Sequence, residues 1–225
     1  MVAHFPGLPK GAKMILIGMY DSPFVRRVGI ALSLYGIAFE HRPWSTFGDA
    51  EKIMPYNPLA RVPTLVLDDG EVLIDSAAIL DALDDMASPA RSMTPASGAA
   101  RRSALKLCAL ASGMADKAVS LVYERHVHER ATQSWIERCT GQISRVMNVL
   151  EVDRTAQDTR YWFGETIGHG DIMVTCAVSF MRDALAGDLD LSPWQALGRH
   201  ADMCEDLPEF REVFMKFTIG QAAGA

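Results

Sequence analysis

The sequence predicts a protein of two domains, a mixed α/β domain followed by an all-helical domain. Short apolar runs bounded by turn residues, typical of strands, occur before residue 87 and not after it. From Ala99 onward, apolar residues recur at steps of three and four, the spacing of helices with one buried face. Between these parts, residues 87–98 have the Pro-, Ser-, Ala- and Gly-rich composition of a linker. We therefore expect domains at 1–86 and 99–225.

Composition excludes several classes of function. The chain has 225 residues, 49% of them hydrophobic, and a formal net charge of -6, which argues against a nucleic-acid or anionic membrane surface. No apolar run approaches the roughly 20 residues that a membrane-spanning helix needs. The opening Met1–Lys13 also lacks the apolar core of a signal peptide. We expect a cytoplasmic protein without a nucleic-acid or membrane partner.

The sequence predicts neither disulfides nor a metal site. Its cysteines all fall in the second part, form no Cys-x-x-Cys pair, and are expected to be small buried groups in a reducing compartment. They are Cys108, Cys139, Cys176 and Cys204. His126 and His128 lie two residues apart on a predicted helix, so their side chains point in different directions and cannot hold one metal ion.

The first candidate site lies where a strand leads into a helix. The apolar run Met14–Ile17 predicts a strand, Ser22 is a good N-cap, and Pro23 suits the first helical position. Apolar residues then recur at helical spacing until Gly36 ends the helix. The backbone N–H groups and the positive dipole end at Ser22 would favour a bound thiolate or carboxylate. Taken alone, Ser22 is most simply an ordinary N-cap.

Two further signals follow along the chain. Arg61-Val62-Pro63-Thr64 precedes the apolar run Leu65–Leu67, which continues through an Asp69-Gly70 turn into a second strand of a hairpin. Asp75-Ser76 then opens a helix in which apolar residues recur at helical spacing. Ser76 alone is again most simply an N-cap.

These three signals, in this order, resemble the glutathione-binding half of the soluble glutathione transferases of the serine type found in bacteria. The matching motifs are Ser-Pro-Phe-Val-x-Arg-Val at 22–28, Asn-Pro-x-x-x-Val-Pro at 57–63 and Asp-Ser at 75–76. The resemblance implies a thioredoxin-like βαβαββα domain followed by an all-α bundle. Gly168-His169-Gly170-Asp171, before the apolar stretch Ile172–Met181, resembles the capped core helix of the second domain in that family.

The resemblance also assigns roles in binding glutathione. Ser22 would donate a hydrogen bond to the sulfur. Val62, exposed by a cis Pro63, would pair its backbone with the cysteinyl part. Ser76 would hold the γ-glutamyl carboxylate, with Asp75 close to the ammonium group.

Some residues depart from the family pattern or offer alternatives. Arg61 is the cation expected to bind the glycyl carboxylate, because the loop Trp44–Asp49 lacks the lysine that some serine-type members carry. Asp21 would oppose thiolate formation unless its carboxylate points away from the sulfur. Tyr20 is an alternative donor to the sulfur, since other classes of the family use a tyrosine near the end of the first strand. Two residues, Met114 and Tyr123, are expected as walls of an electrophile pocket between the domains.

The function implied is conjugation of glutathione, as co-substrate, to small hydrophobic electrophiles in a homodimeric enzyme without a metal. One alternative is a glutathione-dependent isomerase, dehalogenase or peroxidase; the isomerase-type motif Ser-Ser-Cys-x-x-Arg-Val is absent at 21–27, where Asp21-Ser22-Pro23 begin the segment. Another is a non-enzymatic ligand-binding or regulatory member of the family. Retention of all three motifs argues against that second alternative.

Overall fold

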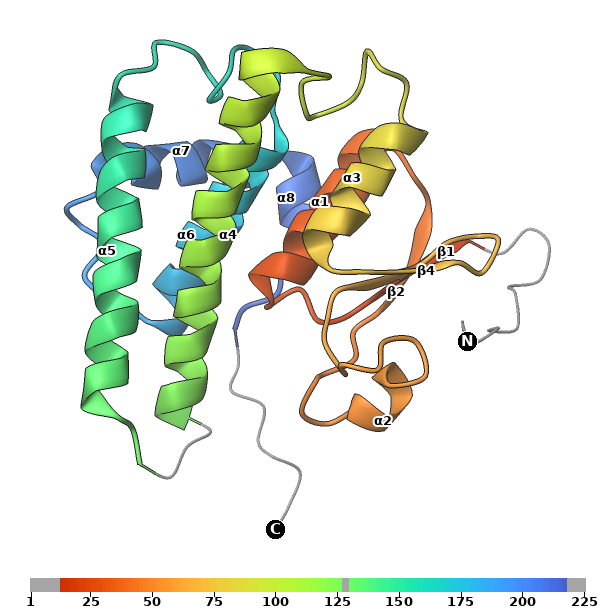
Figure 1. The fold of residues 1–225 in the computed structure, drawn as a ribbon, viewed down its shortest axis with the longest axis horizontal. Helices are drawn as coiled ribbons and strands as arrows, with labels where there is room; N and C mark the ends of the chain where they lie inside the picture. The colour runs from red at the N-terminus through yellow and green to blue at the C-terminus, as the bar shows by residue number, and fades with distance from the viewer. Residues whose placement is uncertain (1–12, 127–129, 218–225) are drawn as a thin grey trace. The chain divides into compact units, whose positions relative to one another are not determined.

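The computed structural model describes residues 13–126 and 130–217, in two compact units (Figure 1). Among the described residues, the first unit comprises residues 13–91 together with Val213–Met215. The second comprises Ser92–Glu212 together with Lys216 and Phe217. The division falls within residues 87–98, and the return of Val213–Met215 to the first unit was not expected from the sequence. His128 and nearly all of Met1–Lys13 lie outside the described residues.

Over its described residues, the first unit is a four-stranded mixed sheet with three helices. Its strands are β1 (Met14–Ile17), β2 (Phe39–Arg42), β3 (Thr64–Val66) and β4 (Val72–Ile74), in the order β2-β1-β3-β4. β1 is parallel to β2 and antiparallel to β3, which is antiparallel to β4. The helices are α1 (Pro23–Tyr35), α2 (Ala50–Ile53) and α3 (Ser76–Met86). This order of elements along the chain confirms the predicted βαβαββα domain. Figure 1 shows α1 and α3 on one face of the sheet and α2 on the other.

Helix α1 follows the local signals of its sequence. Ser22 is its N-cap, and Pro23, which has no N–H to lose, takes the first helical position. Gly36 ends the helix with φ of 68°, and its N–H donates to the carbonyls of Leu32 and Ser33. That left-handed conformation costs glycine little, because glycine has no Cβ. The apolar face of α1 packs into the core, where Val25, Val28 and Leu32 are fully buried.

The register of the sheet brings the three sequence signals to one edge. Ile17, the last residue of β1, pairs with Arg42 at the end of β2 and with Thr64 at the start of β3. Thr64 in turn pairs with Ile74, the last residue of β4. Residues that follow β1, β2 and β4, and those that precede β3, therefore all leave the sheet at the same edge.

The second unit is helical throughout its described residues. Its helices are α4 (Gly98–His126), α5 (Gln133–Thr155), α6 (His169–Ala184), α7 (Gln195–Glu205) and α8 (Pro208–Glu212). Helix α6 is buried on nearly all sides, as its apolar sequence predicts. Asp171 accepts a 2.8 Å hydrogen bond from the N–H of Gly168, as the acidic residue of a capping box does.

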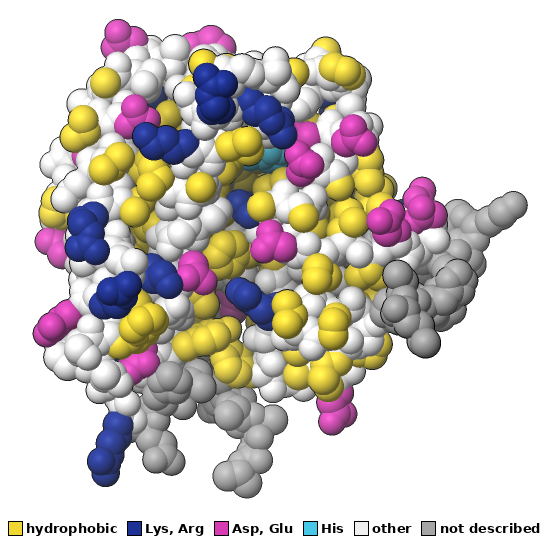
Figure 2. Space-filling model, in the orientation of Figure 1, with side chains coloured by type: hydrophobic (Ala, Val, Ile, Leu, Met, Phe, Trp, Pro, Cys, Tyr) yellow, Lys and Arg dark blue, Asp and Glu magenta, His cyan; other side chains and the backbone are white. Residues whose placement is uncertain are grey.

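Several expectations about side chains can be compared with the described residues. Cys139, Cys176 and Cys204 are buried, whereas Cys108 is partly exposed. Within residues 13–126 and 130–217, no helix is long and apolar enough to cross a membrane. The same part of the chain contains no group of three or more His, Cys, Asp or Glu side chains that could hold a metal ion. On the face shown in Figure 2, Lys and Arg side chains are interspersed with Asp and Glu rather than gathered in a basic stripe.

Candidate functional site

The candidate site lies at the edge of the sheet where β1, β3 and β4 meet the loops of the first unit. Gly18, directly after β1, shows how close these loops approach. A Cβ at Gly18 would lie 2.5 Å from Val25 Cγ2 and 2.8 Å from Val62 Cβ, so only glycine permits this packing. The first turn of α1 and the Val62-Pro63 loop are thereby brought against the same backbone position, with Ser22 one turn before Val25.

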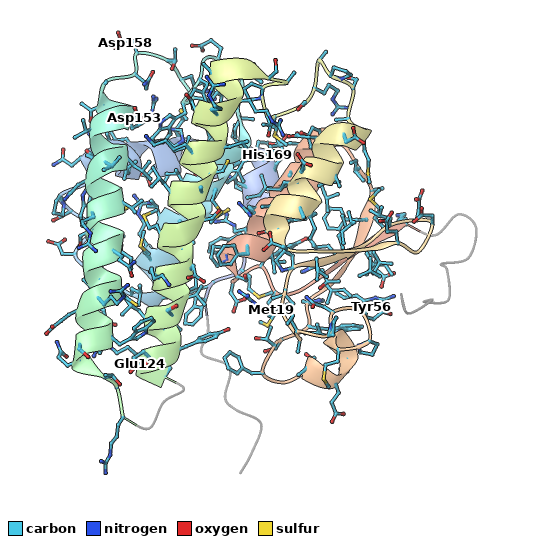
Figure 3. All side chains as sticks on the ribbon, in the orientation of Figure 1. Met19, Tyr56, Glu124, Asp153, Asp158 and His169 are labelled. Atoms are coloured by element: carbon cyan, nitrogen blue, oxygen red, sulfur yellow. The ribbon has the colours of Figure 1, made fainter. Side chains whose placement is uncertain are left out.

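Ser22 occupies the N-terminus of α1. Its N–H donates to the carbonyl of Met19, which Figure 3 labels, where the chain passes from β1 into the helix. Ser22 Oγ accepts a long, 3.5 Å hydrogen bond from the N–H of Val25. A bond of that length holds the oxygen weakly. The hydroxyl proton of Ser22 is not consumed by this bond, so it can be donated to an anion placed at the helix N-terminus.

Tyr20 turns away from that helix terminus. Its ring stacks on the ring of His41, with 3.8 Å between centroids and 9° between planes. A Cβ added at Gly29 would lie 2.9 Å from Tyr20 Cε1 and 3.4 Å from Cζ, the carbon that bears the hydroxyl. Gly29 is seven residues beyond Ser22, roughly 10 Å along the helix axis. Burial raises the pKa of Tyr20 to about 12, so its phenol stays protonated at neutral pH.

Asp21 lies directly beside Ser22. Two effects with opposite signs act on the pKa of its carboxyl group. Burial raises the pKa of Asp21, and the nearby backbone N–H groups of Ser22 and Asp21 offset that effect in part. The raised pKa means that the environment of Asp21 disfavours its charged form.

Asn57 fixes the Val62-Pro63 loop. The Val62-Pro63 peptide bond is cis, as predicted. The buried Asn57 side chain donates from Nδ2 to the carbonyl of Arg61 at 2.9 Å and to Thr64 Oγ1 at 3.3 Å, one residue before and one after this dipeptide. Its Oδ1 accepts from the N–H of Leu59 at 3.1 Å. One amide thus holds both ends of the segment that presents the Val62 backbone.

Helix α3 begins one residue earlier than the sequence suggested. Asp75, not Ser76, is the N-cap, and its carboxylate accepts a 2.8 Å hydrogen bond from the N–H of Ala77. Asp75 adopts φ of 69°, a conformation uncommon for a residue other than glycine. Ser76 is therefore the first helical residue, and its Oγ accepts a 2.6 Å hydrogen bond from Arg27 Nη2. The expectation that Ser76 is an N-cap was wrong, because the strained Asp75 turn places the carboxylate at the cap.

The loop after β2 has its own fixed geometry. Asp49 Oδ2 accepts a 3.0 Å hydrogen bond from the N–H of Ser45, and its Oδ1 pairs with Lys52 Nζ at 2.6 Å. Lys52 lies on α2, three residues beyond the lysine-free loop noted in the sequence. The side chain of Arg61 is exposed at the same edge of the sheet.

The two expected pocket walls both lie on α4 of the second unit. Met114 is 1% exposed and contributes to the core of that unit, whereas Tyr123 is 40% exposed. Their part in an electrophile pocket stays a prediction.

Sequence reasoning missed two residues that organise this site, Arg27 and Asn57. Both stand inside the motifs that carried the resemblance, as the arginine of Ser-Pro-Phe-Val-x-Arg-Val and the asparagine of Asn-Pro-x-x-x-Val-Pro. The signal that could have identified each of them was a polar residue inside a motif made largely of apolar residues. The partner of Arg27 could not be identified from the sequence, because Arg27 and Ser76 are 49 positions apart.

The sequence of this chain is similar to those of known proteins. Residues 16–91 match the family model described as glutathione S-transferase, N-terminal domain. The uncharacterized GST-like protein YibF of Escherichia coli (strain K12) is 33% identical over 173 residues, covering 75% of this chain and 82% of that protein. The maleylacetoacetate isomerase of Pseudomonas aeruginosa is 28% identical, covering 88% of this chain and 94% of that protein.

Solved structures with the same fold cover both units. A glutathione S-transferase from Methylobacillus flagellatus KT, crystallised with glutathione bound, matches with a TM-score of 0.82 and 25% identity over 89% of this chain and 98% of its own. One from Methylobacterium radiotolerans, in complex with glutathione sulfonate, matches with a TM-score of 0.84 and 25% identity over 93% and 99%. With the sequence identity to YibF, the matching family model and the site assembled at the sheet edge, this chain belongs to the glutathione S-transferase family.

Proposed function

We propose that this protein is a glutathione transferase in which Ser22 stabilises the thiolate of glutathione for attack on small hydrophobic electrophiles. The observation that carries the proposal is the convergence of Ser22, Val62-Pro63 and Asp75-Ser76 at one edge of the sheet. The relatives crystallised with glutathione or glutathione sulfonate support the choice of ligand.

The Ser22 hydroxyl and the N-terminus of α1 can together lower the pKa of the glutathione thiol far enough to form the thiolate at neutral pH. A free thiol titrates near 8.5, and lowering that pKa by about two units requires about 2.7 kcal/mol of preference for the anion. One charge-assisted hydrogen bond from the Ser22 hydroxyl supplies about 1.5–3 kcal/mol. The N-terminus of α1 adds about 0.3–1 kcal/mol. These contributions suffice without a general base.

The remaining parts of glutathione have candidate partners at the same edge. The Val62 backbone, held by Asn57, is available to pair with the cysteinyl segment as a short added strand would. Ser76, at the start of α3, would bind the γ-glutamyl carboxylate, and the Asp75 carboxylate would lie near the ammonium group. Arg61 is exposed and would attract the glycyl carboxylate. In the reaction, the thiolate sulfur forms a bond to an electrophilic carbon, and a leaving group such as chloride departs with its bonding electrons while the thiol proton passes to solvent.

Conjugation is favoured here over isomerisation. Isomerases occur among the relatives, and a thiolate could serve that reaction as well. However, Asp21-Ser22-Pro23 stands where the isomerase-type motif has Ser-Ser-Cys. This chain therefore lacks the cysteine of that motif. A parallel assay of cis–trans isomerisation of maleylacetoacetate separates the two reactions.

Binding and turnover test the proposal together. Calorimetry should detect glutathione binding to the purified protein, and a chlorinated nitrobenzene should be conjugated with release of chloride. Absence of glutathione binding at millimolar concentration would refute the proposal. We also expect a homodimer, as in the family, and light scattering at micromolar concentration should give twice the mass of one chain.

A further inference from the structure

Two adjacent buried arginines on α1 are not explained by the activation of a thiol. Arg26 and Arg27 are 4% and 3% exposed, although arginine is among the residues least often buried. Successive helical residues point about 100° apart, so the two side chains reach different parts of the first unit. Arg26 Nε donates to the carbonyl of Val213 at 2.7 Å, and its guanidinium lies 5.3 Å from the centre of the Phe214 ring. Arg26 thus ties the returning segment to α1.

Arg27 reaches the candidate glutathione site instead. Its Nη2 donates to Ser76 Oγ at 2.6 Å, a short distance typical of a charge-assisted hydrogen bond. The ring of Phe24, one turn earlier on α1, lies 5.9 Å from the guanidinium. Ser76 itself is 4% exposed. The contact is therefore shielded from water. In such a buried place the field of a charge is stronger than at an exposed surface.

This contact determines what the Ser76 hydroxyl can do. A serine hydroxyl has one proton to donate and two lone pairs to accept with. Because one lone pair accepts from Arg27, the O–H bond of Ser76 must point away from the guanidinium. A hydroxyl that accepts from a cation is polarised and becomes a stronger donor. The N–H of Ser76, in the first turn of α3, also has no intrahelical acceptor.

We propose that Arg27 is a positioning residue for the α-carboxylate of the γ-glutamyl group: it directs the Ser76 hydroxyl proton to that carboxylate and strengthens the hydrogen bond. The inference rests on the proposed function, since it names how that site recognises one end of glutathione. It also assigns the site a specificity, for thiols that carry a carboxylate at this end. The positive charge of Arg27 acts through Ser76 without touching the ligand.

A purely structural role would give a different result. If Arg27 only joined α1 to α3, its replacement would weaken all ligands of the site alike. The ratio of two affinities separates these roles. The two ligands are glutathione and the analogue in which a 4-aminobutyryl group replaces the γ-glutamyl group, so that only the α-carboxylate is missing.

The test measures both dissociation constants by calorimetry for the wild type, Arg27→Met, Arg27→Lys and Arg26→Met. Methionine fills a similar volume without charge, and such replacements of buried charged groups are often tolerated. The wild type should prefer glutathione over the analogue by about 10-fold or more, the equivalent of one charge-assisted hydrogen bond. Arg27→Met should lose most of that preference, Arg27→Lys should keep part of it, and Arg26→Met, the matched control, should keep it fully. Ser76→Ala should lose it with Arg27 intact.

Each outcome bears on one of the two claims. If Arg27→Met kept the preference for glutathione over the analogue, the role of Arg27 would be overturned and the proposed function would stand. The same would follow if Arg27→Lys kept the wild-type preference while Arg26→Met lost it. A wild type that binds both ligands equally would do the same. A wild type that binds neither ligand would overturn the proposed function and this inference with it.

Discussion

Tyr20 and His41 form a stacked pair on the first unit, with 3.8 Å between ring centroids, and this pair sets the direction of Tyr20. The Tyr20 ring also lies against Gly29 of α1, where a Cβ would come within 2.9 Å of it. The side chain is thus occupied in packing along the helix, whereas Ser22 caps its N-terminus. The relationship favours serine over tyrosine as the group that serves the thiolate.

Tyr20→Phe should therefore change turnover by less than about threefold, equivalent to about 0.65 kcal/mol in activation free energy. The substitution keeps the ring stack and removes only a hydroxyl whose carbon faces Gly29. Steady-state kinetics with a chlorinated nitrobenzene measure the effect. A loss of turnover greater than 100-fold, with the fold intact by circular dichroism, would show that the tyrosine carries the chemistry.

Asp21→Asn should raise the stability of the protein at neutral pH. Because burial raises the pKa of Asp21, the folded state binds a proton more tightly than the unfolded state, and the free energy of unfolding falls as pH rises from about 3.8 through the raised value. Asparagine removes that cost because its amide has a similar size and carries no charge. Urea unfolding should show a more stable variant at pH 7 and a smaller difference near pH 4.

The same substitution should lower the pKa of the bound glutathione thiol, because it removes a negative charge beside Ser22. Asp190→Asn is a control of opposite character, since hydrogen bonds from Ser192 lower the pKa of the exposed Asp190. That control should not stabilise the protein at pH 7. An Asp21→Asn variant that is less stable than the wild type at pH 7 would contradict the assigned environment of the acid.

His41 should make the first unit sensitive to acid. Burial lowers the pKa of His41, although its hydrogen bond to the carbonyl of Gly18, at 2.7 Å, opposes this in part. Stability contributed by the neutral ring is present above about pH 6.5 and is lost as pH falls through the lowered value. His41→Gln retains a donor to Gly18 and should flatten this dependence between pH 7 and pH 5. His126→Gln, at an exposed position, should leave the dependence as in the wild type.

Asn57→Ala should weaken glutathione binding and the fold together. It deletes two donated hydrogen bonds and one accepted bond at a buried position, a loss of about 2–3 kcal/mol in unfolding free energy. Thr64→Val is the matched control, because it retains shape in β3 and removes only the hydroxyl contacts of the same loop. Urea unfolding and the glutathione KM should change more in Asn57→Ala. Equal KM values in the alanine variant and the wild type would exclude a part for this loop in binding.

The local elements of the first unit could be predicted from the sequence because their signals are local. The ends of α1 are marked by Ser22, Pro23 and Gly36 through backbone preferences that act within one turn. The hairpin of β3 and β4 is marked in the same way by Asp69-Gly70. The start of α3 was misplaced by one residue, since a non-glycine residue with φ of 69° has no sequence signal of its own.

Contacts between distant segments could not be predicted. The Arg27–Ser76 hydrogen bond and the packing of Tyr20 on Gly29 and His41 depend on how the sheet and α1 are packed. The sequence proposed both Ser22 and Tyr20 as donors to sulfur, and only the direction of the tyrosine ring distinguishes them. The role of Arg26 was equally hidden, because Val213 lies 187 positions away.

The thiolate absorbance of bound glutathione, titrated between pH 5 and pH 9 in the wild type and in Ser22→Ala, tests the proposed role of Ser22 most directly. The wild type should hold the thiolate at neutral pH, and Ser22→Ala should raise the pKa of the thiol by about one to two units, equivalent to the loss of one charge-assisted hydrogen bond of about 1.5–3 kcal/mol. Turnover at pH 7 should then fall by about 10- to 150-fold. A Ser22→Ala variant that keeps both the absorbance and the rate of the wild type would contradict activation of glutathione by this serine.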